Sequence, residues 1–270
     1  MSRRVTWLCG LPVSLEGTYL PGWAPCAETA AIAFRFDERP PPARLGGEAL
    51  LEGDGVAVHG RGGTLEVAAW NREEPDQRAW ARVDVAASAV EIRSTGERGS
   101  TWLRHEVLPE LVVSHLWPLH GVAYLHASGT LHGGRARLLL GSSGAGKSTA
   151  AALLQAAGDQ PFCVDRAGVT ADWASPAPFH GGAPASGGRA PLASLFSLDR
   201  RAPPGTRRLA PPEALACLAA NAFLPRWWPP GLEAGLDLLG KLAERRPIDR
   251  LSSEPDERLV ERVARASLGA

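Results

Sequence analysis

The 270-residue chain carries no formal net charge, because 29 lysines and arginines balance 29 aspartates and glutamates. Proteins that bind nucleic acid carry a basic excess, so this balance argues against DNA or RNA as the partner. An apolar fraction of 44% supports a sizeable core and argues against a disordered chain. No stretch approaches the roughly 18 apolar residues that a membrane span needs.

Cysteine usage indicates a reducing compartment. The four cysteines are widely scattered and include no C-x-x-C pair, which suits neither a zinc site nor a disulfide framework. They are Cys9, Cys26, Cys163 and Cys217. We therefore expect reduced thiols in a cytoplasmic protein.

Residues 1–100 alternate short apolar runs with turn residues, a pattern typical of strands. The runs are Ala30 to Phe36, Gly55 to His59, Thr64 to Ala69, Ala81 to Val85 and Ala89 to Ile92. This part is predicted to be a β-rich N-terminal region. Its tryptophans are expected to pack against the rest of the chain or to shape an acceptor site.

Residues 101–270 are predicted to form a second domain of mixed α and β structure. A helix is expected over Ser100 to His120, with Pro109 near its first turn. Val122 to Leu131 is predicted to be one strand of a hairpin, followed by a turn at 132–135 and a returning strand over Ala136 to Leu140.

The elements after the hairpin follow from apolar periodicity and from breakers. We expect helices at Lys147 to Ala157 (ended by Gly158), Pro211 to Phe223, Leu232 to Ala243 and Pro255 to Leu268, and strands at Gln160 to Val164 and Leu192 to Leu198. The Gly-, Pro- and Ser-rich stretch from Ala174 to Gly188 is predicted to be a mobile loop over a site.

A phosphate-binding motif lies between the hairpin and the following helix. It matches G-x-x-x-x-G-K-[ST] at every fixed position and runs Gly141, Ser142, Ser143, Gly144, Ala145, Gly146, Lys147, Ser148, with Thr149 next. Glycines let successive backbone N–H groups point at phosphate oxygens, and the following helix directs its positive end at the same anion. Lys147 is expected to reach the phosphates, and Ser148 the Mg²⁺ ion. The competing interpretation is a glycine-rich turn that matches by chance.

Two further residues are candidates for chemistry. Asp165 ends the short strand after the motif's helix, where a carboxylate can hold Mg²⁺ or take the proton from an attacking hydroxyl. Its alternative role is to cap a turn. His126 precedes the hairpin turn, and the sequence leaves a structural and a catalytic role open for it.

These segments resemble a known family. Residues 125–129, the motif at 141–149 and Val164-Asp165-Arg166 are similar to the C-terminal domain of HPr kinase/phosphorylase and its kinase-like relatives. Members carry a histidine about fifteen residues before the loop, as His126 does, and an Asp-Asp pair after the helix. The resemblance covers about residues 100–265.

The resemblance implies an α+β fold with the nucleotide-binding core shared with phosphoenolpyruvate carboxykinase, in a mixed, largely antiparallel sheet. It implies ATP and Mg²⁺ as cofactors and phosphoryl transfer to a serine-like hydroxyl of a peptide, protein or small molecule. His126, Lys147 and Asp165 are then the catalytic candidates, and Ser148 and Asp165 the metal ligands. One position departs from the family: Val164 stands where the first Asp, the expected base, belongs.

Three functions are therefore compared. The first is a hydroxyl-directed kinase that uses ATP and Mg²⁺. The second is a nucleotide-binding regulatory or scaffolding protein with impaired catalysis, suggested by Val164. The third is a carboxykinase-like or phosphorolytic enzyme on the same core.

Overall fold

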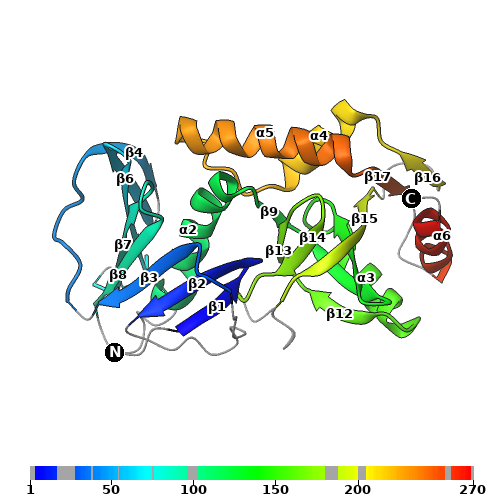
Figure 1. Cartoon of the computed structure of the whole chain (residues 1–270), viewed down its shortest axis with the longest axis horizontal. Coiled ribbons are helices and arrows are strands. Elements are labelled where there is room, and N and C mark those ends of the chain that lie inside the picture. The colour runs from blue at the N-terminus through cyan, green and yellow to red at the C-terminus, as the bar shows by residue number, and fades with distance from the viewer. Residues whose placement is uncertain are drawn as a thin grey trace. The chain divides into compact units, whose positions relative to one another are not determined.

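The computed structural model describes residues 4–16, 28–37, 39–53, 55–74, 76–95, 103–179, 188–199, 205–252 and 257–268. The chain divides into two compact units (Figure 1). The first comprises residues 1–116 and 225–231, and the second comprises residues 117–224 and 232–270.

The first unit is built on an eight-stranded mixed sheet with the order β1-β2-β3-β8-β7-β6-β5-β4. Its strands are β1 (Arg4–Leu8), β2 (Leu11–Glu16), β3 (Ile32–Asp37), β4 (Glu48–Gly53), β5 (Val56–Arg61), β6 (Thr64–Trp70), β7 (Arg78–Asp84) and β8 (Ala89–Ser94). Each of the five strand-like runs of the sequence falls on one of these strands, so the prediction of a β-rich region is confirmed.

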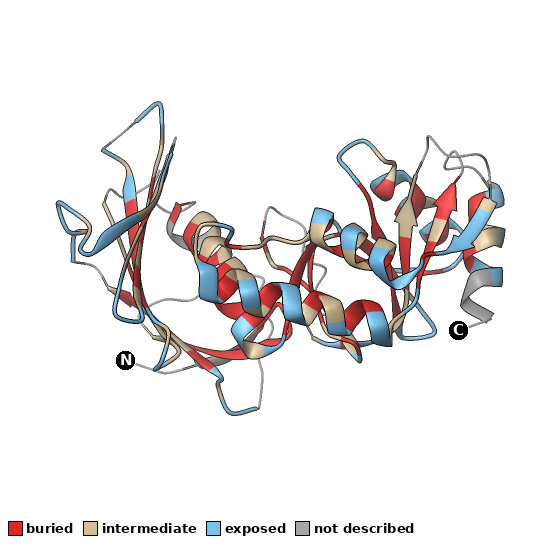
Figure 2. Ribbon diagram, turned by 90° about the horizontal axis from the view of Figure 1, so that it is seen from above, coloured by how far each residue is buried: buried red, intermediate tan, exposed pale blue. Residues whose placement is uncertain are grey.

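The two faces of this sheet differ in character, as strict alternation requires. Strand β6 alternates half-buried and buried residues along its whole length, and Val67 and Ala69 are almost fully buried. Figure 2 shows the buried residues along the strands and the exposed residues at the hairpin tips. The apolar face packs on the π-helical turn η1 (Leu103–Val107) and helix α2 (Leu108–Leu116).

The first unit thus extends past residue 100, where the sequence divided the chain. Leu103, Leu108 and Val112 are fully buried because η1 and α2 cover strands β6, β7 and β8. The expected helix over 100–120 is split into η1, α2 and the 3-10 turn η2 (Trp117–His120), and residues 100–102 lie outside the described residues.

The second unit holds a mixed sheet whose main path is β12-β10-β11-β15-β14-β13-β9. Its strands are β9 (Ala123–His126), β10 (Ser128–His132), β11 (Arg135–Leu140), β12 (Gln160–Cys163), β13 (Arg166–Val169), β14 (Trp173–Pro176), β15 (Ala190–Leu198), β16 (Gly205–Arg208) and β17 (Ile248–Ser252). Among the described strands of this unit, only β11 with β15 and β15 with β17 pair in parallel. The chain is thus a mixed α and β protein with two mixed sheets, which fits the expected α+β class.

Two expectations for this unit are corrected. The single strand expected over 122–131 is two strands, because Ala127 interrupts the pairing: β9 pairs with β13, whereas β10 pairs with β11 and β12. The N–H of Ala127 donates to the carbonyl of Asp165, which turns the chain between the strands. The start of the expected loop at 174–188 belongs to strand β14, and residues 180–187 lie outside the described residues.

The observed helices after residue 140 agree closely with the predicted ones. They are α3 (Lys147–Ala156), α4 (Pro211–Asn221), α5 (Pro229–Arg245) and α6 (Glu257–Leu268), with the expected start of the last at 253–256 outside the described residues. Within the described part of the chain, no helix is long and apolar enough to cross a membrane.

Candidate functional site

The predicted phosphate-binding motif forms the connection between the buried strand β11 and helix α3. Leu138, Leu139 and Leu140 are fully buried at the end of the strand, and the loop begins directly after them at Gly141. Gly144 and Gly146 have φ of +77° and +92°, in the left-handed region that favours glycine. Strand, tight loop and helix N-terminus therefore follow in the order that the motif requires.

The ammonium group of Lys147 closes the loop on itself. Its Nζ donates to the carbonyl oxygen of Gly141 at 2.7 Å and to that of Ser142 at 3.2 Å. The residue is only 7% exposed, and burial lowers the pKa of the ammonium group. An anion in the loop would offer this group better acceptors than two backbone carbonyls, because charge-assisted hydrogen bonds are the stronger kind.

Helix α4 holds the start of the loop through Asn221, which the sequence did not single out. Its Oδ1 accepts the N–H of Gly141 at 3.0 Å, and its Nδ2 donates to the carbonyl of Cys217 at 2.8 Å. Asn221 is 8% exposed, so both groups of the amide are satisfied inside the unit. No sequence signal marks this residue, because it lies 80 positions from its partner.

Several amides of the loop remain available. The N–H of Ala145 donates to the carbonyl of Ser142, which forms a turn inside the loop. Among the residues that the structure describes, the N–H groups of Ser143, Gly144 and Gly146 donate to no protein acceptor. Unpaired amides in a left-handed glycine turn are the groups that bind anions.

A pocket of about 330 Å³ opens on one side of the loop. It gathers the predicted catalytic and metal-binding residues from strand β9, helix α3 and the end of strand β12. Its lining consists of His126, Ser128, Ser143, Gly144, Gly146, Lys147, Ser148, Thr149, Val164 and Asp165. Residues from three separate segments of the chain, 126–128, 143–149 and 164–165, thus meet in one place.

His126 and Asp165 contact one another directly in this pocket. The Nδ1 atom of His126 lies 3.0 Å from both the backbone oxygen and Oδ1 of Asp165. The other carboxylate oxygen of Asp165 pairs with Arg166, whose guanidinium lies over the ring of Phe223 at 4.9 Å. With Nδ1–H donating to Asp165, the Nε2 atom of the imidazole keeps its lone pair.

The surroundings favour the neutral form of this imidazole. Burial lowers the pKa of His126, and the positive charges of Lys147 and Arg166 lower it further. Because the ordinary value is 6.5, the ring is predominantly neutral at pH 7. A neutral imidazole oriented by a carboxylate is a competent proton acceptor.

Val164 occupies the remaining wall of the pocket. Its side chain is 58% exposed, an unusual state for a large apolar residue, and its carbonyl accepts the hydroxyl of Ser128 at 2.5 Å. Ser128 itself is buried, and no role was predicted for its hydroxyl. The backbone at Val164 is therefore held in place while its isopropyl group faces the pocket.

A second cavity of about 690 Å³ lies on the other side of the loop. Gly141, Ser142 and Ala145 line it, and Ser143 and Gly144 line both cavities. Asp199 and Arg250, whose Nη1 lies 3.9 Å from the aspartate Oδ2, contribute the charged wall. The nine loop residues singled out from the sequence are thus divided between two cavities that meet at the loop's tip.

The described residues include no group of three or more His, Cys, Asp and Glu side chains that could hold a metal ion. Ser148 and Asp165, the two metal ligands expected from the sequence, line the same pocket. This fits Mg²⁺, which is usually bound by one or two protein oxygens together with phosphates and water.

No protein-family model matches this chain, and a search of curated proteins gave no match.

Proposed function

We propose that the second unit binds ATP with Mg²⁺ and transfers the terminal phosphoryl group to a hydroxyl of a peptide, protein or small-molecule acceptor. The observation that carries this proposal is the pocket at the loop, where Lys147, unpaired amides and the His126–Asp165 pair meet. The P-loop core of the HPr kinase and phosphoenolpyruvate carboxykinase type belongs to the same proposal.

The roles follow from the chemistry of each group. Lys147 and the amides of the loop would hold the phosphates, and the adjoining cavity leaves room for the nucleoside. The acceptor oxygen attacks the terminal phosphorus as the bond to the bridging oxygen breaks, and its proton passes to Nε2 of His126. Asp165 orients the imidazole and stabilises the imidazolium that forms.

Mg²⁺, when bound with the nucleotide, would neutralise charge on the phosphates, and Ser148 and Asp165 are the residues that would hold it. Asp165 has two carboxylate oxygens, one near His126 and one paired with Arg166. Binding of a metal would therefore compete with Arg166 for that carboxylate.

The first test is binding. Calorimetric titration with ATP and Mg²⁺ should show a saturable heat, and Lys147→Ala should weaken binding by roughly 10- to 100-fold, since charged hydrogen bonds contribute about 1.5–3 kcal/mol. Lys241→Ala is the matched control, because Lys241 is the only other lysine of the sequence and pairs with Asp237 on the surface. Equal affinities of the two variants would refute the assigned role of the loop.

The second test is turnover. ADP formation from ATP and Mg²⁺ should require Lys147 and should decline as the pH falls through the lowered pKa of His126. His126→Gln should reduce the rate and abolish that pH dependence while ATP binding stays intact. A His126→Gln enzyme with an unchanged rate and pH profile would exclude this residue as the base.

Val164 supports the alternative of a nucleotide-binding protein with impaired catalysis. Its exposed isopropyl group lines the pocket at the position where the family that the sequence resembles carries the Asp expected to act as the catalytic base. Val164→Asp separates the two functions: a large gain in turnover over an inactive parent identifies an impaired relative. If the parent turns over and the variant gains nothing, His126 already supplies the base.

A further inference from the structure

The larger of the two cavities at the loop contains an arginine to which the proposed function gives no role. Arg250 lies on strand β17 and lines the cavity of about 690 Å³ together with the loop residues Gly141 to Ala145. Both the arginine and the loop belong to the second unit. A positive side chain beside a predicted phosphate loop can serve the phosphates or the rest of the nucleotide, and its position decides between them.

The cavity lies at the carboxyl ends of three adjacent parallel strands. Leu140 of β11 pairs with Ser197 of β15, and Ser197 pairs with Arg250 of β17, so the three residues lie side by side in the sheet. Two strand spacings, about 10 Å, therefore separate the backbone of Arg250 from that of Leu140, where the loop begins. The ribose and base of a nucleotide can cover this span, and the carboxyl ends of parallel strands are common ligand sites.

The guanidinium of Arg250 is accessible and makes no hydrogen bond to the described residues. Its side chain is 32% exposed, and Nη1 lies 3.9 Å from Oδ2 of Asp199. At that distance the two charges attract one another, but the contact is longer than a hydrogen bond. The buried Nε atom has no partner among the described residues either. Because an arginine carries five N–H donors and no acceptor, this group is suited to acceptor atoms of a ligand.

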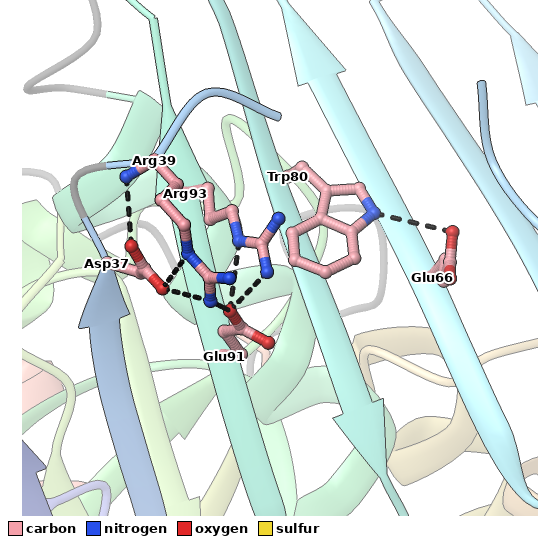
Figure 3. A network of polar contacts seen from close by, with 6 residues as sticks. All are labelled: Asp37, Arg39, Glu66, Trp80, Glu91 and Arg93. Atoms are coloured by element: carbon pink, nitrogen blue, oxygen red, sulfur yellow. Dashed lines mark hydrogen bonds and ion pairs between the residues drawn. The ribbon is translucent and has the colours of Figure 1, made fainter. Parts of the chain in front are cut away.

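Arginines that stabilise the fold are paired more closely than Arg250. In the first unit, Arg93 lies 2.6 Å and Arg39 3.0 Å from the same oxygen of Glu91 (Figure 3). In the second unit, Nε of Arg208 lies 2.7 Å from its aspartate partner on β17. These distances are those of charge-assisted hydrogen bonds. The longer contact of Arg250 sets it apart from these structural pairs.

The helix that forms the opposite wall leaves room for a flat ring. Ala216 and Ala220 are exposed, lie one turn apart on α4 and both line the cavity. Glu213, a further lining residue, is bound through both carboxylate oxygens to Arg207 at 2.8 Å. The cavity therefore combines a small apolar wall with the donors of Arg250. A nucleobase, with an apolar face and acceptors at its edge, matches both.

The loop identifies the occupant of this cavity. Ser143 and Gly144 line both cavities, so a ligand whose phosphates lie at the loop can extend into either one. The smaller pocket contains the His126–Asp165 pair and would receive the acceptor hydroxyl. The nucleoside then occupies the larger cavity.

On the basis of the proposed nucleotide binding, we propose that Arg250 recognises the base of the nucleotide. Its guanidinium donates hydrogen bonds to acceptor atoms at the edge of the base, and the charge of Asp199 orients it. Inorganic triphosphate, which has no base, does not reach this group. Arg250 is thus a binding residue for the nucleoside and has no role in holding the phosphates.

Calorimetric titrations with ATP and with inorganic triphosphate, each with Mg²⁺, test this role. Wild type should bind ATP at least about tenfold more tightly than triphosphate. Arg250→Gln and Arg250→Lys should both weaken ATP binding by roughly 5- to 20-fold, because neither keeps the planar fork. In Arg250→Lys, which keeps the charge, the affinity for triphosphate should change by less than about twofold. Arg245→Lys is the matched control, an exposed arginine that pairs with Asp172 and does not line the cavity.

The outcomes separate the role of Arg250 from nucleotide binding itself. If neither ATP nor triphosphate binds to wild type, nucleotide binding fails and the role of Arg250 fails with it. If wild type binds both equally tightly, the phosphate loop stands and base recognition is overturned. The same conclusion follows if Arg250→Lys binds ATP like wild type, or if it weakens triphosphate as much as ATP.

The thiol of Cys217 provides a second test on the wild-type chain. It is half-buried and lines the same cavity, and burial raises its pKa. Alkylation with N-ethylmaleimide at about pH 8.5 can be followed by mass spectrometry on the peptide that contains Cys217. Saturating ATP with Mg²⁺ should slow the reaction severalfold, whereas saturating triphosphate should leave it nearly unchanged. Equal protection by the two, or none by ATP, would exclude this cavity as the site of the base.

Discussion

The sharpest prediction for stability concerns His115, a buried histidine on the inner side of helix α2. Its Nδ1 contacts the carbonyl of Leu111, its ring packs on Trp227 at 4.5 Å, and its Nε2 is buried without a hydrogen-bond partner. Protonation would place a charged N–H in an apolar site. Burial accordingly lowers the pKa of His115 from 6.5 to about 4.

The sign of the effect on stability follows from proton counts. Between pH 6.5 and about 4 the unfolded chain binds a proton at this histidine and the folded chain does not, so the free energy of unfolding falls as the pH is lowered. The loss should be about 2 kcal/mol at pH 5 and about 3 kcal/mol below pH 4. At pH 7 and above the contribution is absent.

The comparison of wild type with His115→Gln isolates this term. His120 and His126, whose pKa values are also lowered by burial, remain in both proteins and cancel. Urea unfolding should be followed by tryptophan fluorescence, because all of the nine tryptophans except Trp117 and Trp173 belong to the first unit. Wild type should lose about 2 kcal/mol more than the variant between pH 7 and 5. Equal losses would refute the reasoning.

Three other substitutions test single contacts of the second unit by urea denaturation at pH 7. Asn221→Leu leaves the N–H of Gly141 buried without an acceptor and should cost about 1–3 kcal/mol. Asp159→Ala removes the carboxylate that pairs with the buried Arg137 at 3.3 Å and should cost about 3–5 kcal/mol. Gly144→Ala meets no atom within 4 Å, so its cost should be only the roughly 1–2 kcal/mol of a left-handed backbone. A neutral Asn221→Leu or Asp159→Ala, or a Gly144→Ala costing far more, would contradict these assignments.

Local pattern explains which elements the sequence predicts well. Strand β6 alternates at every position because one face is buried under helix α2 and the other is only half-buried, and period-2 alternation is visible without knowing the partner. The motif at 141–148 likewise needs only its own glycines and lysine to be recognised. Such features depend on contacts within a few residues.

Features set by distant contacts could not be predicted in this way. The run at 122–131 has the pattern of one strand, and only the bond from Ala127 to Asp165, with the separate partners of β9 and β10, shows that it forms two. The role of Asn221 depends on a donor, the N–H of Gly141, 80 residues away, and the end of the segment 39–46 is held by Glu66, 20 residues from Gly46. An Asn in a helix and a Glu in a strand carry no local mark of such roles.

A valine instead of an aspartate at position 164 has opposite consequences for binding and for turnover in the proposed site. With Asp165 as the carboxylate of the pocket lining, the positive charges of Lys147 and Arg166 are less compensated, which favours a polyphosphate anion. The same charges lower the pKa of His126 and so weaken it as a base. Val164→Asp should therefore reduce the affinity for ATP, measured by calorimetric titration. The same variant should raise the basicity of His126, measured as a shift of the pH–rate profile to higher pH.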